Sequence, residues 1–104
     1  MQTTHDPMSV ADARHRITDA ISKDGVTSIM SVSGNVITIM IENGYLEIAT
    51  NGIHASFNTS KLDVDFDDNG KMFFSEYFTD NKSFALIDIS NVDMVVWNPW
   101  ETVY

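Results

Sequence analysis

Residues 65–76 carry oxygen-bearing side chains at the spacing of a calcium-binding loop. The run Asp-Phe-Asp-Asp-Asn-Gly is followed by five residues and then a glutamate, which satisfies the pattern D-x-[DN]-x-[DN]-G-x₅-E. The candidate oxygen ligands are Asp65, Asp67, Asn69 and Glu76. One functional hypothesis is therefore a calcium- or ligand-binding module that uses this loop.

The flanks of this segment favour a β-hairpin over a calcium loop. A calcium loop of this type needs a helix on each side, whereas residues 62–67 alternate between apolar and acidic side chains, as in a strand. A three-residue loop over 68–70 would place Gly70 at a left-handed position that glycine tolerates well. We therefore predict a hairpin and expect neither a metal site nor a cofactor. Its predicted pairs are Phe66 with Met72, Val64 with Phe74, and Asp67 with Lys71.

The predicted hairpin gathers carboxylates into a negative stripe. Asp63, Asp65 and Asp67 would share its outward face, because side chains alternate along a strand. Asp68 would lie at the tip. We predict that all of these acids bind a partner. The sequence has no nucleophile motif and no Gly-rich phosphate loop, so we expect a non-enzymatic protein.

The net charge narrows the class of partner. Fifteen acidic and six basic residues give a net charge of −9, of which −6 belongs to residues 53–104. Such a surface repels phosphate backbones, so direct binding of nucleic acid is not expected. It attracts a basic protein surface instead, such as that of a nucleic-acid-binding enzyme. The competing interpretation is that the acidic surface only keeps the protein soluble.

Aromatic residues near the C-terminus are a second group of candidate partner contacts. Trp and Tyr are typical anchors of protein interfaces. We predict that Trp97 covers the core from a final strand, whereas Trp100 and Tyr104 either fold back over the core or bind a partner. Self-association into a homodimer, through these aromatics or through a sheet face, is the scaffold hypothesis.

The elements that position these residues begin with an amphipathic helix, predicted over residues 10–23. Ser9 is a suitable N-cap, and Gly25 suits the position just after the helix. The apolar side chains that recur at helical spacing are Val10, Ala13, Ile17, Ala20 and Ile21.

A four-strand meander is predicted to follow, with two-residue turns at Gly34-Asn35, Asn43-Gly44 and Asn51-Gly52. All three turns place one apolar set on a single face, and a slip of one residue would break that agreement. The set is Met30, Val32, Ile37, Ile39, Ile41, Leu46, Ile48, Ala55 and Phe57. Further strands are predicted near residues 62–67, 71–78, 83–89 and 93–97.

These elements predict an α+β fold, in which one N-terminal helix packs on a bent antiparallel meander of about seven strands. A small barrel and a roll similar to pleckstrin-homology domains are the alternatives. Residues 1–8 are predicted to form a flexible tail and residues 9–104 a single domain, since this length is usual for one core. There is no cysteine, no signal-peptide pattern and no apolar stretch of membrane-spanning length. We therefore expect a cytoplasmic protein that does not bind membranes.

The functional prediction is an acidic binding protein that acts as an inhibitor or accessory protein. It would occupy the basic groove of a nucleic-acid-handling enzyme, as a nucleic-acid mimic, or it would neutralise a toxin. Phage-encoded counter-defence proteins are similar to this chain in size and charge.

Overall fold

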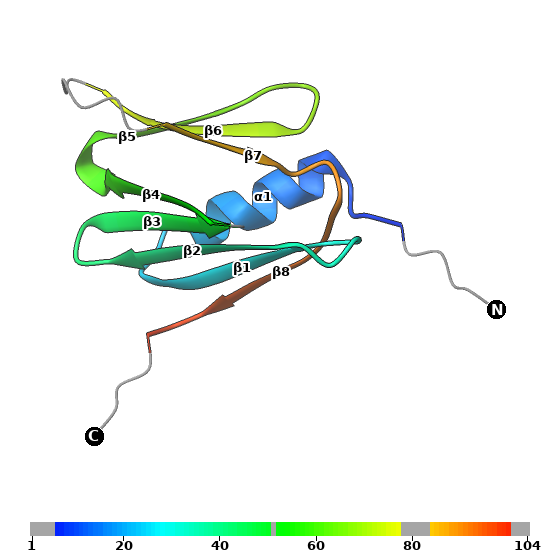
Figure 1. Ribbon diagram of the computed structural model, residues 1–104, viewed down its shortest axis with the longest axis horizontal. Coiled ribbons are helices and arrows are strands. Elements are labelled where there is room, and N and C mark those ends of the chain that lie inside the picture. Colours follow the sequence, from blue (N-terminus) through cyan, green and yellow to red (C-terminus); the bar gives the residue numbers. More distant parts are fainter. Residues whose placement is uncertain (1–5, 51, 78–83, 101–104) are drawn as a thin grey trace.

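The computed structural model describes residues 6–50, 52–77 and 84–100, and it has the predicted order of a helix followed by strands (Figure 1). The elements are α1 (Val10–Ala20), β1 (Gly25–Ser31), β2 (Val36–Glu42), β3 (Tyr45–Thr50), β4 (Ile53–Asn58), the 3-10 turn η1 (Thr59–Lys61), β5 (Leu62–Phe66), β6 (Lys71–Glu76), β7 (Phe84–Asp88) and β8 (Val92–Asn98). The predicted α+β class is confirmed, with eight strands in the described residues.

The strands form two antiparallel sheets rather than one. The larger sheet has the order β4-β3-β2-β1-β8 and the smaller has the order β5-β6-β7. Each sheet keeps two edge strands, so the described strands do not close into a barrel. In Figure 1 the three-stranded sheet lies above the five-stranded sheet, and α1 lies behind them. The apolar core fills the space between the inner faces of the two sheets and the helix.

The two sheets are joined at a corner between β4 and β5. The Glu76 carboxylate on β6 accepts the backbone N–H of Asn58 at 2.7 Å, which ties the end of β4 to the smaller sheet. Below this link, the rings of Phe57 and Phe74 lie with their centroids 6.1 Å apart. Both rings are almost fully buried, so they connect the two sheets through the core.

The helix begins as predicted and ends earlier. The Ser9 hydroxyl oxygen accepts the backbone N–H of Asp12 at 3.1 Å, as expected for an N-cap. The helix ends at Ala20 instead of residue 23. In the turn that follows, the Ser22 hydroxyl donates a hydrogen bond to the Asp19 carbonyl oxygen. The predicted apolar face is confirmed, since Ala13, Ile17 and Ala20 are buried and the two remaining members pack beside them.

Two of the three predicted turn registers are confirmed. Ile41 pairs with Leu46 across the Asn43-Gly44 turn, where both turn residues have positive φ, as a type I′ turn requires. The registers on either side of residues 51–52 give the pairs Ile48 with Ala55 and Leu46 with Phe57.

The register predicted from Gly34-Asn35 is wrong. The loop has three residues, 32–34, and is closed by the Ser31 N–H, which donates to the Asn35 carbonyl oxygen at 2.9 Å. Only Gly34 needs positive φ, so the glycine occupies the last loop position instead of the first. The change exchanges the two faces of β1, so the side chains predicted to face outward face the core. Ile29 replaces Met30 and Val32 in the core and pairs with Ile37.

The last described strand lies beside the first one in the larger sheet. β8 pairs with β1, and α1 packs on these two strands. Met8, within the segment predicted to be a tail, donates its N–H to the Val92 carbonyl oxygen at 2.8 Å and packs against the core. In the described ranges, no helix has the length and apolar character needed to cross a membrane.

Candidate functional site

β5 and β6 form the predicted hairpin. Its loop is residues 68–70, Gly70 has a φ of 85°, and the Asp67 N–H donates to the Lys71 carbonyl oxygen at 3.0 Å. The observed register gives the predicted pairs, Phe66 with Met72 and Val64 with Phe74.

This hairpin separates the side chains of the calcium pattern. Glu76 lies opposite Leu62 at the far end of the strands from the loop, and its carboxylate is bonded to Asn58. Asp65 lies on the outer surface opposite Phe73. Within the described residues, no three acidic or histidine side chains come together as a metal site would need. The geometry of residues 65–76 is therefore that of a strand pair and not of a calcium loop.

The predicted acidic stripe is present with one difference. Asp63 and Asp65 are exposed on the outer surface of β5, and Asp68 is exposed at the tip. Asp67 is half-buried, and its Oδ1 accepts the N–H groups of Asn69 at 2.9 Å and Lys71 at 2.8 Å. Its carboxylate therefore holds its own loop instead of pointing outward, because Asp at a turn readily bonds backbone donors just ahead of it.

Apolar side chains lie beside these acids on the outer surface of the smaller sheet. Phe84 and Leu86 on β7 are 59% and 50% exposed, although both are large and apolar. Phe73 lies on the central strand, β6, and its ring centroid is 6.1 Å from that of Phe84 on β7. We call this surface the acidic–apolar face. Its outward residues are Asp63, Asp65, Phe73, Ser75, Phe84 and Leu86.

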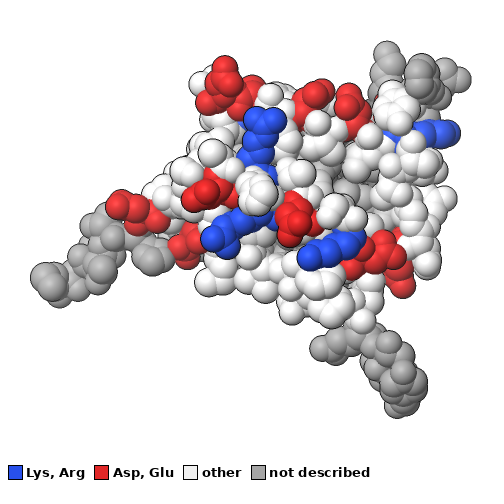
Figure 2. All heavy atoms as spheres, turned by 180° about the vertical axis from the view of Figure 1, so that it is seen from behind, with Lys and Arg blue, Asp and Glu red and all other residues white. Residues whose placement is uncertain are grey.

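A single ion pair closes one end of the acidic–apolar face. The Lys71 ammonium donates to the Asp88 carboxylate at 2.8 Å, so this base is already neutralised. Arg14 lies over the Phe66 ring, on the inner side of β5. Figure 2 shows acidic side chains along the top of the molecule, with basic side chains close below and beside them, and mixed charges lower down. Within β5 itself, Asp63 and Asp65 are the only charged residues, and the exposed Lys61 directly precedes the strand.

The ion pair predicts a dependence of stability on pH. Hydrogen bonds from Lys71 and Ser90 lower the pKa of Asp88 from 3.8 to about 2. A carboxyl group with a lowered pKa in the folded state stabilises it above the unfolded pKa, and this contribution is lost as pH falls from about 4 to about 2. We expect Asp88→Asn to be less stable than the parent at neutral pH and equal to it near pH 2, by urea unfolding at several pH values.

A control separates this pair from general charge. The Asp24 carboxylate is exposed and makes no hydrogen bond to a described residue, so Asp24→Asn should change stability little at any pH. A gap between Asp88→Asn and the parent that stays constant from pH 6 to pH 2 would contradict the assignment.

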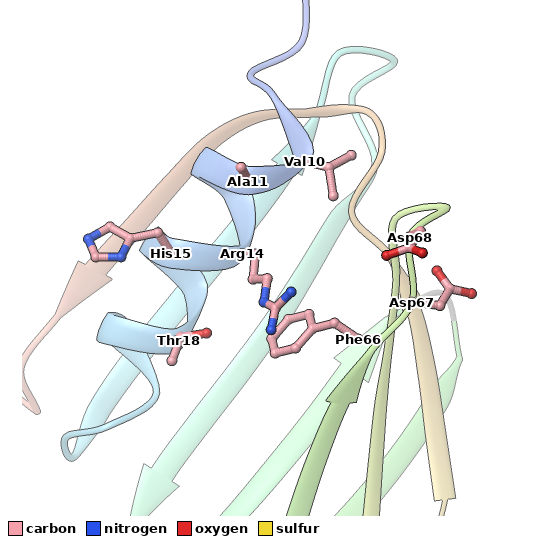
Figure 3. A pocket seen from close by; sticks show the side chains of 8 residues that line it. All are labelled: Val10, Ala11, Arg14, His15, Thr18, Phe66, Asp67 and Asp68. Carbon is pink, nitrogen blue, oxygen red and sulfur yellow. The ribbon is translucent and has the colours of Figure 1, made fainter.

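A groove of 480 Å³ lies between α1 and the tip of the hairpin. In Figure 3 the Arg14 side chain extends from the helix toward Phe66, while Asp67 and Asp68 stand at the tip and His15 points away. The guanidinium carbon of Arg14 is 4.3 Å from the centre of the Phe66 ring, a cation–π contact. The helix wall of the groove carries the charged Arg14 beside the uncharged side chains of Val10, Ala11 and Thr18, and His15 also lines it.

Trp97 and Trp100 do not join the acidic–apolar face. The Trp100 indole N–H donates to the Ile41 carbonyl oxygen at 2.6 Å, on the larger sheet, and the side chain is 40% exposed. Trp97 lies on the predicted final strand, β8, where it is half-buried beneath the Lys23 ammonium and close to Gly25. Tyr104 lies outside the described residues.

Sequence reasoning found the acids and missed their apolar neighbours. The signal was present, because Phe84 and Leu86 alternate with the buried Ala85 and Ile87 and so must face outward in a strand.

Comparison with known proteins adds no relative, since no family model, no curated protein and no solved structure matches this chain.

Proposed function

We propose that this protein is a non-enzymatic binding protein that docks a basic protein surface through its acidic–apolar face. The observation that carries the proposal is the exposure of Phe84 and Leu86 in the same sheet as the unpaired acids Asp63 and Asp65. Protein interfaces combine an apolar centre with a polar rim. Here the rim is negative, which favours a partner rich in Lys and Arg.

The role that fits such a face is inhibition or assistance of a basic protein in the cytoplasm. A nucleic-acid-binding enzyme has a basic groove, and a row of carboxylates competes there for the place of phosphates. An antitoxin or a phage counter-defence protein would act in the same physical way. Exposed aromatic and aliphatic side chains at the centre would then hold the partner after charge has steered it in.

A second candidate is self-association through the outer face of the larger sheet. On β8, β1 and β2 most of the outward side chains are uncharged, although the chain is strongly acidic, and the acid Glu42 stands at the end of β2. They include three of the six methionines, Met30, Met40 and Met94. Methionine is enriched at interfaces and charge is depleted there. A mass measurement on the protein alone distinguishes this scaffold role from the docking role.

The first test removes the exposed acids and leaves the fold intact. The triple variant carries Asp63→Asn, Asp65→Asn and Asp68→Asn, and it keeps Asp67 because that residue holds the hairpin loop. Proteins captured from a host lysate by the parent are identified, and their association rates are measured at low and high salt. We expect association with the triple variant to be at least about tenfold slower at low salt, because surface charge steers encounter.

A control variant with the same net charge isolates position from total charge. Its three exposed acids lie away from the acidic–apolar face, in the changes Asp6→Asn, Asp24→Asn and Glu42→Gln. Equal slowing by both variants would assign the effect to net charge alone. Equal rates for parent and triple variant would remove the docking proposal, and a dimeric mass for the protein alone would then favour the scaffold role.

A further inference from the structure

β5 is an edge strand with one unpaired side. The Asp67 N–H and the Lys61 carbonyl oxygen both bond to the neighbouring β6 segment, at Lys71 and Tyr77. Backbone groups alternate between the two sides of a strand. The N–H and C=O groups of the intervening residues therefore point away from β6, and no described residue pairs with them. These residues are Leu62, Val64 and Phe66.

The groove between α1 and the hairpin begins where this unpaired edge ends. Phe66 is the last residue of β5 and also lines the groove, whose helix wall includes Val10, Arg14 and Thr18 (Figure 3). Its volume of 480 Å³ is within the usual size of ligand pockets, about 300–1,000 Å³. An extended segment along β5 would therefore have backbone partners beside it and a cavity at its end.

We propose that β5 accepts an extended basic peptide segment of the partner as an added antiparallel strand. Strand addition to an exposed sheet edge is a general mode of peptide recognition, in which main-chain hydrogen bonds supply affinity and alternate side chains supply specificity. The inference rests on the proposed function, because it specifies how the basic partner is held.

The alternation along β5 dictates the sequence of that segment. Asp63 and Asp65 point to the outer surface, so the peptide side chains opposite them should be Lys or Arg. Leu62, Val64 and Phe66 point inward, so the residues opposite them should be apolar. The Arg14 guanidinium over Phe66 repels a base at that end of the groove. The fitting segment thus alternates basic and apolar residues and is uncharged next to Phe66.

Charge excludes a second copy of this chain from the same edge. Two β5 strands paired together would place Asp63 and Asp65 opposite acids of the other copy, and like charges opposite one another destabilise a sheet. Charged side chains on an edge strand are a known protection against self-pairing. The other edge of this sheet, β7, lacks an acid free to select a base, since Asp88 is bonded to Lys71. A basic partner is therefore specific to β5.

Synthetic peptides test the inference without knowledge of the partner. The probe is a seven-residue peptide that alternates Val and Lys, with blocked ends, and binding is measured by calorimetry at low salt. One derivative is N-methylated at the valines, whose N–H groups would face β5. A second is N-methylated at the lysines, whose N–H groups would face away. We expect the first derivative to bind at least about tenfold more weakly than the second, because only it loses the donors to β5.

Hydrogen exchange gives an independent readout on the protein. On addition of the alternating peptide, the amides of Val64 and Phe66 should exchange more slowly, whereas those of Asp63 and Asp65 are already bonded to β6 and should change little. A permuted peptide of the same composition, with its lysines in one block, should bind more weakly.

Each remaining result overturns the strand-addition proposal in a recognisable way. Equal, salt-sensitive binding of the alternating, permuted and both methylated peptides would show recognition by charge alone, with the docking function intact. No binding of any peptide, together with slowed association of the triple acid variant with its captured partner, would mean that docking uses the face without the edge. Failure of both tests would remove the proposed function itself.

Discussion

Phe74→Ala should lower the free energy of unfolding by about 3–5 kcal/mol, the usual cost of removing a buried Phe ring. Phe74 is fully buried on β6, and its ring meets that of Phe57 from the other sheet. The substitution therefore leaves a cavity where aromatic rings of the two sheets are in contact. Small domains have about 5–15 kcal/mol of stability in total, so a large part of it would be lost. Urea unfolding followed by circular dichroism measures the change.

Phe84→Ala is the matched control for this prediction. It removes the same ring from the neighbouring strand of the same sheet, but Phe84 is 59% exposed. We expect a loss below about 1 kcal/mol, because little surface is buried there. Similar losses for the two variants would contradict the division into inner and outer faces on which the docking site depends.

Gly25→Ala should be nearly as damaging, although it adds a single methyl group. A Cβ at this position would lie 2.6 Å from the Asn98 carbonyl oxygen and 2.3 Å from the Trp97 indole nitrogen. The backbone φ of 151° is also unfavourable for any residue with a side chain. Because β1 and β8 cannot keep their spacing, we expect a loss of about 3 kcal/mol or more, measured as above.

Gly34→Ala separates the effect of space from that of backbone conformation. Gly34 has a φ of 94°, and a Cβ there would meet nothing within 4 Å. Gly34→Ala should lower the free energy of unfolding only through the unfavourable backbone conformation, by about 1–2 kcal/mol. If Gly25→Ala cost no more than Gly34→Ala, the close approach of β8 to Gly25 would be wrong.

Local signals predicted the hairpins wherever the turn chemistry had one solution. Asn43-Gly44 fits a two-residue turn in which both residues need positive φ, and the register followed. The segment before Val36 contains Gly34 followed by Asn35, which suits both a two-residue loop and a three-residue loop that ends in glycine. Alternation could not decide between them, because Ile29, Met30 and Val32 offer apolar residues to both faces of β1.

Long-range geometry was beyond the reach of the sequence pattern. Gly25 follows a helix and so suggested a C-terminal cap, whereas its position is required by Trp97 on a distant strand. The division into two sheets depends on the corner at Asn58 and Glu76, a contact between residues that no periodicity connects. The acids of the site were readable because side chains alternate locally. The unpaired edge of β5 could not be predicted in this way, since it depends on which strands lie side by side in the folded protein.

The pairing of β1 with β8 limits how far this protein can fold while it is still being synthesised on the ribosome. Most strands pair with a neighbour in sequence, but Val26 lies opposite Asn98, and α1 packs on β8. Chains are made from the N-terminus, so the helix and the first hairpins emerge long before their last support. Until Asn98 has left the exit tunnel, the part of α1 that packs on β8 and one edge of β1 remain uncovered. We expect nascent chains stalled before β8 to be held by chaperones and cut by proteases at sites that the finished protein hides.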